Sequence, residues 1–155
     1  MAEPEVVMTD PHEIVSSRSF DAPRDAVFRA FSDPQALSQW WGPRGYTNTF
    51  HEFDFRTGGT WRLVMHAPDG NSYPMTKQFV EVTSPERIVL LHPEPPEHRF
   101  TMTVTLQAED QRTRVTWHLR FDSAQEVARV GAFIKEANEQ NFDRLAALLA
   151  SSGAP

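Results

Sequence analysis

Hydrophobic residues recur at every second position through much of the chain between residues 60 and 121. This spacing is typical of β-strands that bury one face and expose the other. The clearest case is the stretch in which Phe100, Met102 and Val104 alternate with threonines. The pattern predicts strands at 13–20, 45–55, 60–67, 73–83, 86–92, 98–108 and 111–121. The last six are joined by short turns containing Gly, Pro, Asp or Asn, so we expect antiparallel neighbours.

One predicted strand departs from simple alternation. Phe50 has the opposite parity to Phe53 and Phe55. We therefore expect either a β-bulge or a strand that is buried on both faces. The turn that follows contains Gly58 and Gly59, which we interpret as a tight turn that needs a positive φ.

Two short helices are predicted between the first two strands. The first covers 23–31, and the second begins with Asp33 as N-cap and Pro34 at its first position. A Gly-Pro pair ends the second helix after Trp40 and Trp41. Adjacent residues of a helix cannot both face the core. We therefore expect one tryptophan to anchor the helix and Trp41 to contact a pocket.

A long helix is predicted at 124–150, with Ser123 and Glu126 forming a capping-box pattern at its start. At about 1.5 Å per residue it spans about 40 Å, enough to lie across a small sheet. Asn138 and Asn141 interrupt its apolar stripe. A buried unpaired amide costs about 1–3 kcal/mol, so these amides either find a partner or lie at a solvated edge. Asn138 is the stronger candidate for a pocket.

Together these elements predict an α+β, helix-grip fold. A curved antiparallel sheet of six to seven strands wraps around the long C-terminal helix, and two short helices follow the first strand. Only the long helix is large enough to cover the apolar face of the sheet. The space between helix and sheet, near the short helices, is the default ligand pocket.

Five landmarks along the chain resemble those of a known family. They are Trp40-Trp41-Gly42-Pro43, Phe55-Arg56-Thr57-Gly58-Gly59, Pro68-Asp69-Gly70, Ser84-Pro85-Glu86-Arg87-Ile88 and Phe142-Asp143-Arg144-Leu145. As an ordered set they resemble the AHSA family, homologues of the C-terminal domain of the heat-shock protein 90 ATPase activator, in the SRPBCC (START-like, Bet v-like) superfamily. The resemblance covers about 12–150 and implies the helix-grip fold without fixing an activity.

The resemblance also has one informative departure. Many relatives have a Gly-Trp pair where this chain has Ala137-Asn138. This implies that an amide replaces a bulky cover over the cavity. The chaperone-stimulating relatives carry an additional N-terminal domain, for which 155 residues leave no room. The resemblance is therefore to the single-domain bacterial members.

Composition narrows the class of protein. The 155 residues suit one domain, expected at 12–150 between frayed ends at 1–11 and 151–155. The absence of cysteine excludes disulfides, thiolate metal sites and cysteine nucleophiles. A net charge of −6 disfavours nucleic acid and anionic membranes as partners. The sequence contains neither a signal peptide nor an apolar stretch long enough for a membrane span, so we expect a cytoplasmic protein.

Candidate ligand-binding residues are those whose side chains are predicted to face the space between sheet and helix. They are Trp41, Trp61, Leu63, Met65, Phe79, Phe100, Met102, Trp117, Ile134, Asn138 and Phe142. The alternative for most of them is a closed core, because large aromatic residues and methionine also fill irregular interior space.

Residues able to carry chemistry are few. The six histidines lack the spacing of metal ligands, and His92 and His98, beside a proline-rich loop, are interpreted as surface residues. Lys77 and Glu81 share the parity of Phe79, and they are the only titratable groups whose side chains the pattern predicts to face the interior. We therefore predict no metal, no cofactor and no catalytic residue.

Three functions remain open. The first is a binding protein for a small hydrophobic or amphipathic molecule, in which Arg44 and Arg56 either bind a ligand carboxylate at the entrance or form surface ion pairs. The second is an enzyme of cyclase, dehydratase or hydrolase type, which is disfavoured because catalysis needs an acid or base in the cavity. The third is a protein-interaction or co-chaperone-like module. A homodimer is compatible with each.

Overall fold

The computed structural model describes residues 10–93 and 99–151. The elements are β1 (Glu13–Phe20), α1 (Arg24–Ser32), α2 (Pro34–Trp40), β2 (Thr47–Phe53), β3 (Thr60–His66), β4 (Ser72–Thr83), β5 (Arg87–His92), β6 (Phe100–Glu109), β7 (Arg112–Phe121) and α3 (Ala124–Ser151). Each predicted strand and helix is present, with ends within two residues of the expected ones. The expectations for residues 1–9, His98 and 152–155 lie outside the described residues.

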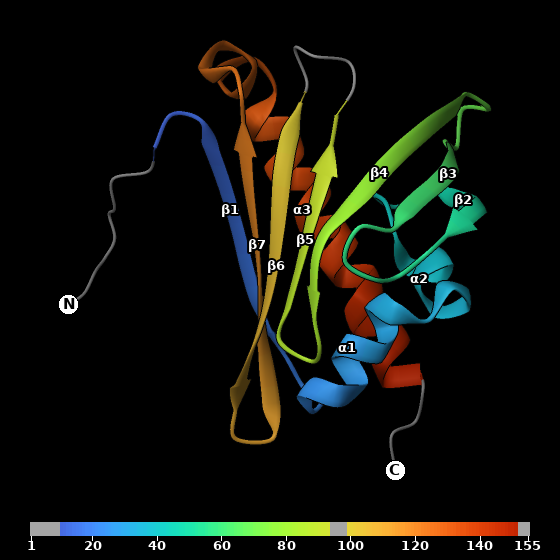
Figure 1. Ribbon diagram of the computed structural model, residues 1–155, viewed down its shortest axis with the longest axis vertical. Helices are drawn as coiled ribbons and strands as arrows, with labels where there is room; N and C mark the ends of the chain where they lie inside the picture. The colour runs from blue at the N-terminus through green and yellow to red at the C-terminus, as the bar shows by residue number, and fades with distance from the viewer. Residues whose placement is uncertain (1–9, 94–98, 152–155) are drawn as a thin grey trace.

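The seven strands form one antiparallel sheet in the order β1-β7-β6-β5-β4-β3-β2 (Figure 1). From β2 to β7 every strand pairs with its successor, as the short turns predict. The exception is β1, which pairs with β7 along its whole length, from Glu13 opposite Arg120 to Phe20 opposite Thr113. The N-terminal strand therefore closes one side of the sheet.

Two bulges change which side chains face inward. The first, between Phe50 and Glu52 of β2, confirms the expected irregularity and lets Phe50 and Phe53 stack on the same side. The second lies between Phe79 and Glu81 of β4. It reverses the alternation, so the inward orientation expected for Glu81 is wrong: its carboxylate lies 3.3 Å from the Arg87 guanidinium at the surface.

The turn before β3 depends on its two glycines for different reasons. Gly58 has φ +89°, as the interpretation of a positive-φ turn requires. Gly59 is needed for space, because a Cβ atom there would lie 1.9 Å from the carbonyl oxygen of Asp54.

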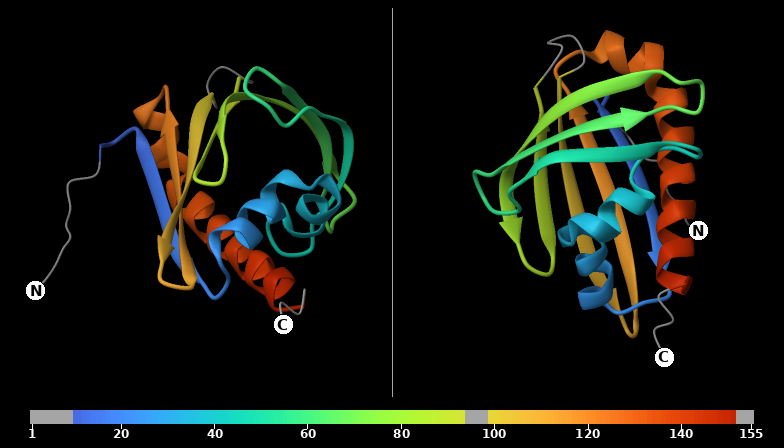
Figure 2. Two further views of the ribbon diagram at one scale, coloured as in Figure 1. Left: turned by 60° about the horizontal axis from the view of Figure 1, so that its bottom comes forward. Right: turned by 90° about the vertical axis from the view of Figure 1, so that its right-hand side faces the viewer.

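The helices all lie on the concave side of the sheet (Figure 2). α3 packs against β1, β7, α1 and α2. At its start the Glu126 amide donates to Ser123 Oγ at 3.1 Å, which confirms the predicted cap, and the Glu126 carboxylate pairs with Arg129. None of the described helices has the length and apolarity needed to cross a membrane.

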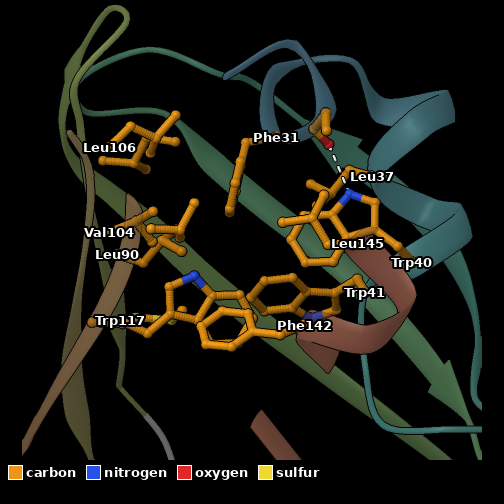
Figure 3. Close-up of a cluster of buried hydrophobic side chains, with 14 of the residues drawn as sticks. Phe31, Leu37, Trp40, Trp41, Leu90, Val104, Leu106, Trp117, Phe142 and Leu145 are labelled. Atoms are coloured by element: carbon orange, nitrogen blue, oxygen red, sulfur yellow. Dashed lines mark hydrogen bonds between the residues drawn. The ribbon is translucent and has the colours of Figure 1, made fainter. Parts of the chain in front are cut away.

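Both tryptophans at the end of α2 are buried, with Trp40 at 1% and Trp41 at 8% exposure. The expectation that only one could face the core is wrong, because the helix ends at Trp40 and Trp41 is already extended (φ −69°, ψ 133°). Trp40 anchors the helix by donating its indole N–H to the Ala30 carbonyl at 2.9 Å (Figure 3). The chain then turns Trp41 toward Trp117 and Phe142.

Candidate functional site

A pocket of about 200 Å³ lies between the middle of α3 and the inner face of the sheet. Four parts of the fold enclose it: α3, the strand pair β6–β7, the strand pair β3–β4, and the loop that follows α2. Its lining residues are Trp41, Gly42, Pro43, Met65, Met75, Lys77, Phe100, Met102, Trp117, Leu119, Ile134, Ala137, Asn138 and Asn141. Most of these side chains are apolar, so the pocket suits a ligand with a large apolar part.

The structure brings together seven of the eleven candidate residues: Trp41, Met65, Phe100, Met102, Trp117, Ile134 and Asn138. The other four, Trp61, Leu63, Phe79 and Phe142, do not line this pocket and are almost fully buried in the packed core. Trp61 and Phe79 stack on each other there at 6.1 Å. These four side chains are therefore part of the closed core, the alternative that the sequence offered for most of the candidates.

Side chains of α3, Asn141 and Arg144 among them, hold the loop after α2 in place. Asn141 accepts from the Gly42 amide at 3.2 Å and donates to the Trp40 carbonyl at 2.7 Å. Arg144 donates to the carbonyl oxygens of Trp41, Gly42 and Pro43 at 3.0–3.2 Å, and burial lowers its pKa. These bonds fix the Trp41 side of the pocket and give the resembling Trp-Trp-Gly-Pro and Phe-Asp-Arg-Leu segments a shared structural role.

Gly42 allows this loop to approach the sheet. Its φ of +101° suits glycine, and a Cβ atom there would lie 2.8 Å from Met65 Cε. Met65 itself lines the pocket. A side chain at position 42 would therefore press into the pocket wall.

Three aromatic residues give the pocket its walls. Trp41 and Trp117 lie with their ring centroids 5.6 Å apart, and Trp117 packs against Phe142 at 4.7 Å. Phe100 forms another part of the lining and stacks on His92 at 4.9 Å. An aromatic ligand in this space finds both ring faces and ring edges.

Among the described residues, Lys77 is the one charged residue that lines the pocket, and only 6% of it is exposed. Its Nζ lies 3.3 Å from His92 Nδ1 and 5.5 Å from the centroid of the Phe100 ring. Within the described residues it has no carboxylate partner, and burial lowers its pKa to about 8. The alternation along the strand predicted that Lys77 faces inward. The contact between Lys77 and His92 was missed, because the neighbouring proline-rich stretch suggested that His92 lies at the surface.

Asn138 places its amide on the helix side of the pocket. Its Nδ2 donates to Ser16 Oγ of β1 at 3.3 Å, while among the described residues no donor is bound to its Oδ1. Asn141, by contrast, uses both of its amide atoms to hold the α2 loop. Asn138 is therefore the amide of α3 that has an acceptor left for a ligand.

The other candidate polar residues lie elsewhere. Arg56 pairs with Asp54 at the surface, and the Arg44 side chain is exposed. His118 pairs with Glu13 at 3.2 Å, and His66 contacts Thr49 at 2.9 Å. No cluster of three metal-binding side chains occurs within residues 10–93 and 99–151.

A larger hollow of about 630 Å³ lies beside β2, β3 and β4. Its lining includes Arg62, Thr76 and His92, and it shares Met75 with the first pocket. Most of its lining side chains are polar or partly exposed. It lacks the aromatic walls that make the first pocket suitable for an apolar ligand.

Comparisons with known proteins agree with this architecture. Residues 21–150 match the family model described as "Activator of Hsp90 ATPase homolog 1-like protein". A solved protein from Arthrobacter aurescens is similar at 24% identity and TM-score 0.85, covering 94% of this chain and 91% of its own. A protein from Nitrosomonas europaea is similar at 22% identity and TM-score 0.83, covering 95% and 99%.

A third solved structure, an AHSA1-like protein from Aeromonas hydrophila, is similar at 20% identity and TM-score 0.74, with 91% of this chain and 94% of its own covered. At these identities the structural likeness shows the fold alone. A comparison with curated proteins gives no match.

Proposed function

The chain belongs to the activator of Hsp90 ATPase homolog 1-like family, and we propose that it binds a small hydrophobic or amphipathic molecule in the pocket beneath α3. The family and its SRPBCC, helix-grip fold suggest a ligand-binding domain. One observation supports the proposal most directly: an aromatic-walled space with few polar groups remains open inside a core that is otherwise tightly packed.

An interaction module has less support on the described part of the chain. Its large exposed apolar side chains are Val15, Tyr73, Val80 and Phe133, which belong to three different elements. Single apolar residues at a surface are normal and do not mark an interface. We therefore favour the pocket.

Asn138→Trp tests this proposal. A tryptophan at this position extends from α3 into the pocket and fills it. Titration with 2-phenylethanol is expected to change the tryptophan fluorescence of the wild type, and either 2-phenylethanol or indole is expected to raise its melting temperature by mass action. The variant is expected to remain folded and to lose both responses, with affinity reduced at least about tenfold.

Phe133→Trp provides the matched control. Position 133 is on the same helix, but its side chain is 71% exposed. This variant adds the same ring outside the pocket and is expected to bind as the wild type does. If N138W binds normally, the pocket beneath Asn138 is not the site. If the wild type responds to neither compound, small-molecule binding of this size class is contradicted.

A further inference from the structure

Lys77 places a charge in a pocket whose other lining residues are mostly apolar, and binding of an apolar molecule gives this charge no role. The chain has only two lysines, and the other, Lys135, is exposed on α3. Burying an ammonium group is costly unless an anion or several hydrogen bonds compensate it. In the described structure Lys77 Nζ has the His92 ring at 3.3 Å and the face of Phe100 at 5.5 Å, but no carboxylate. An anion supplied from outside the chain would provide that compensation.

We propose that the pocket selects a small aromatic carboxylate, with its carboxylate on Lys77 Nζ and its ring between the aromatic walls. This inference rests on the proposed function and adds to it the chemical class of the ligand. Hydrogen bonds between an ammonium and a carboxylate are among the stronger ones, and they strengthen further in apolar surroundings. The carboxylate of the ligand therefore gains most beside Lys77, whose charge has no carboxylate partner in the described part of the chain.

The size of the pocket sets the size of the ligand. A dry cavity of about 150 Å³ holds one benzene molecule. The pocket here, at about 200 Å³, has room for a single ring with a short acidic arm. Trp41, Trp117 and Phe100 line it, and aromatic pairs gain from edge-to-face and offset contacts beyond their buried area.

The groups around the pocket favour an anion over a cation. No carboxylate is among the lining residues within 10–93 and 99–151, and Lys77 would repel an ammonium group. Around Lys77, β5 contributes His92, β3 contributes Trp61 opposite it, and β6 contributes Phe100. The lining residues of α3 are uncharged and include the Asn138 amide, which can donate only through Nδ2.

The test compares two ligands that share a phenyl ring and a two-carbon chain: phenylacetate, which is charged, and 2-phenylethanol, which is neutral. Each is titrated at pH 7 into wild type, Lys77→Met and the control Lys135→Met, with binding followed by protein-observed NMR. We expect wild type and K135M to bind phenylacetate about 10–100-fold more tightly than 2-phenylethanol. In K77M the two affinities are expected to fall within about threefold.

The outcomes separate this inference from the proposed function. If both ligands bind wild type with equal affinity, the carboxylate preference is wrong while small-molecule binding stands. If phenylacetate is preferred but K77M keeps the preference, Lys77 is not its anchor and the inference is overturned. If neither ligand binds wild type, both proposals fail.

A second measurement does not require a variant to fold. With two lysines in the chain, NMR can follow the titration of the Lys77 side chain directly, with Lys135 as internal reference. Bound phenylacetate is expected to raise the Lys77 pKa, because a nearby anion favours the ammonium form, while 2-phenylethanol is expected not to raise it. An unchanged pKa with phenylacetate bound would overturn the inference.

Discussion

At the scale of single residues, Lys77 and Asn141 line the same pocket, but they differ in the partners available to their polar groups. Asn141 is bonded at both ends of its amide to the backbone of the α2 loop. Removing it would leave a backbone amide and a carbonyl without their partner. Lys77 has an aromatic face and an imidazole nitrogen, and its charge is uncompensated within the described residues. Asn141 is therefore structural, whereas Lys77 costs stability.

Lys77→Met is expected to raise the free energy of unfolding at pH 7. The folded-state pKa of Lys77, about 8, lies below the ordinary lysine value of 10.5, so the unfolded chain holds the proton more tightly. The stability of wild type relative to K77M therefore rises as pH increases from about 8 to about 10.5. Urea denaturation should show K77M more stable by about 2–3 kcal/mol at pH 7.

The difference in stability between K77M and wild type should narrow above pH 10, where Lys77 becomes neutral in both the folded and the unfolded state. The groups facing Lys77 are His92 from β5 and the uncharged lining of β3, β6 and α3. K135M, at an exposed position, is expected to differ from wild type by less than about 0.5 kcal/mol at both pH values. A K77M protein that is less stable than wild type at pH 7 would contradict this account.

Alternation along the strand was enough to predict that Lys77 faces inward, because side-chain direction in a strand has a period of two. It could not predict that no carboxylate within residues 10–93 and 99–151 pairs with Lys77, since that depends on which side chains β5 and β6 place beside it. The same limit applies to Trp61 and Phe79. Their inward direction was predicted, but whether they line a void or fill it depends on how closely three strands pack.

At the scale of elements, Arg144 joins the C-terminal half of α3 to the loop after α2. It donates to four backbone carbonyls, those of Gln39, Trp41, Gly42 and Pro43. An α-helix leaves its last carbonyls without partners, and a cation near that end is favourable. This side chain therefore does for α2 what a C-terminal cap does in other helices.

Arg144→Met is expected to lower the free energy of unfolding by about 2–3 kcal/mol, because several buried carbonyls lose a charged donor at once. It should also weaken binding of 2-phenylethanol, since the Trp41 side of the pocket is no longer fixed. Denaturation and fluorescence titration measure the two effects. Arg56→Met, which removes only the surface pair with Asp54, is the control and should change stability by less than about 1 kcal/mol. Equal effects of the two substitutions would contradict the inference that Arg144 stabilises the loop after α2.

The elements themselves were predicted well because they carry strong local signals: two-residue periodicity, an Asp-Pro helix start and glycine-containing turns. The β4 bulge was missed because no such signal marks it, and the parity of Glu81 was wrong for that reason. The early end of α2 was missed because one residue, Trp41, stands between the last helical residue and the Gly-Pro pair. The extended backbone of Trp41 lets its side chain face the pocket.

At the scale of the whole molecule, α3 packs against β1 and β7, while β3 and β4 face it across the pocket (Figure 2). The two halves of the sheet therefore differ in how firmly they are held. Regions with fewer packed contacts open more readily and exchange their amide hydrogens faster. The helix-grip architecture was predicted from the sequence and is confirmed, but the size of the gap between its halves was not predictable, since it is the volume left after packing.

Hydrogen exchange should reflect this difference. Amides of β3 and β4 are expected to exchange faster than those of β6 and β7 in the free protein. A saturating pocket ligand such as indole is expected to slow exchange in β3, β4 and the middle of α3, because it joins them across the gap, and to leave the outer part of β1 unchanged. Uniform slowing over the whole sheet would indicate a global gain in stability without this local effect.

The position of β1 has a consequence for how the chain acquires its shape. Its neighbour β7 follows all five other strands in the sequence, so that Ser17 contacts Thr116, 99 positions later. A ribosome releases the first strand long before the strand it must pair with exists. Contacts between such distant segments form slowly because a long loop must close first. Until β7 has been synthesised, this N-terminal segment has no strand edge to join, so the side of the sheet that packs against α3 can form only after that point.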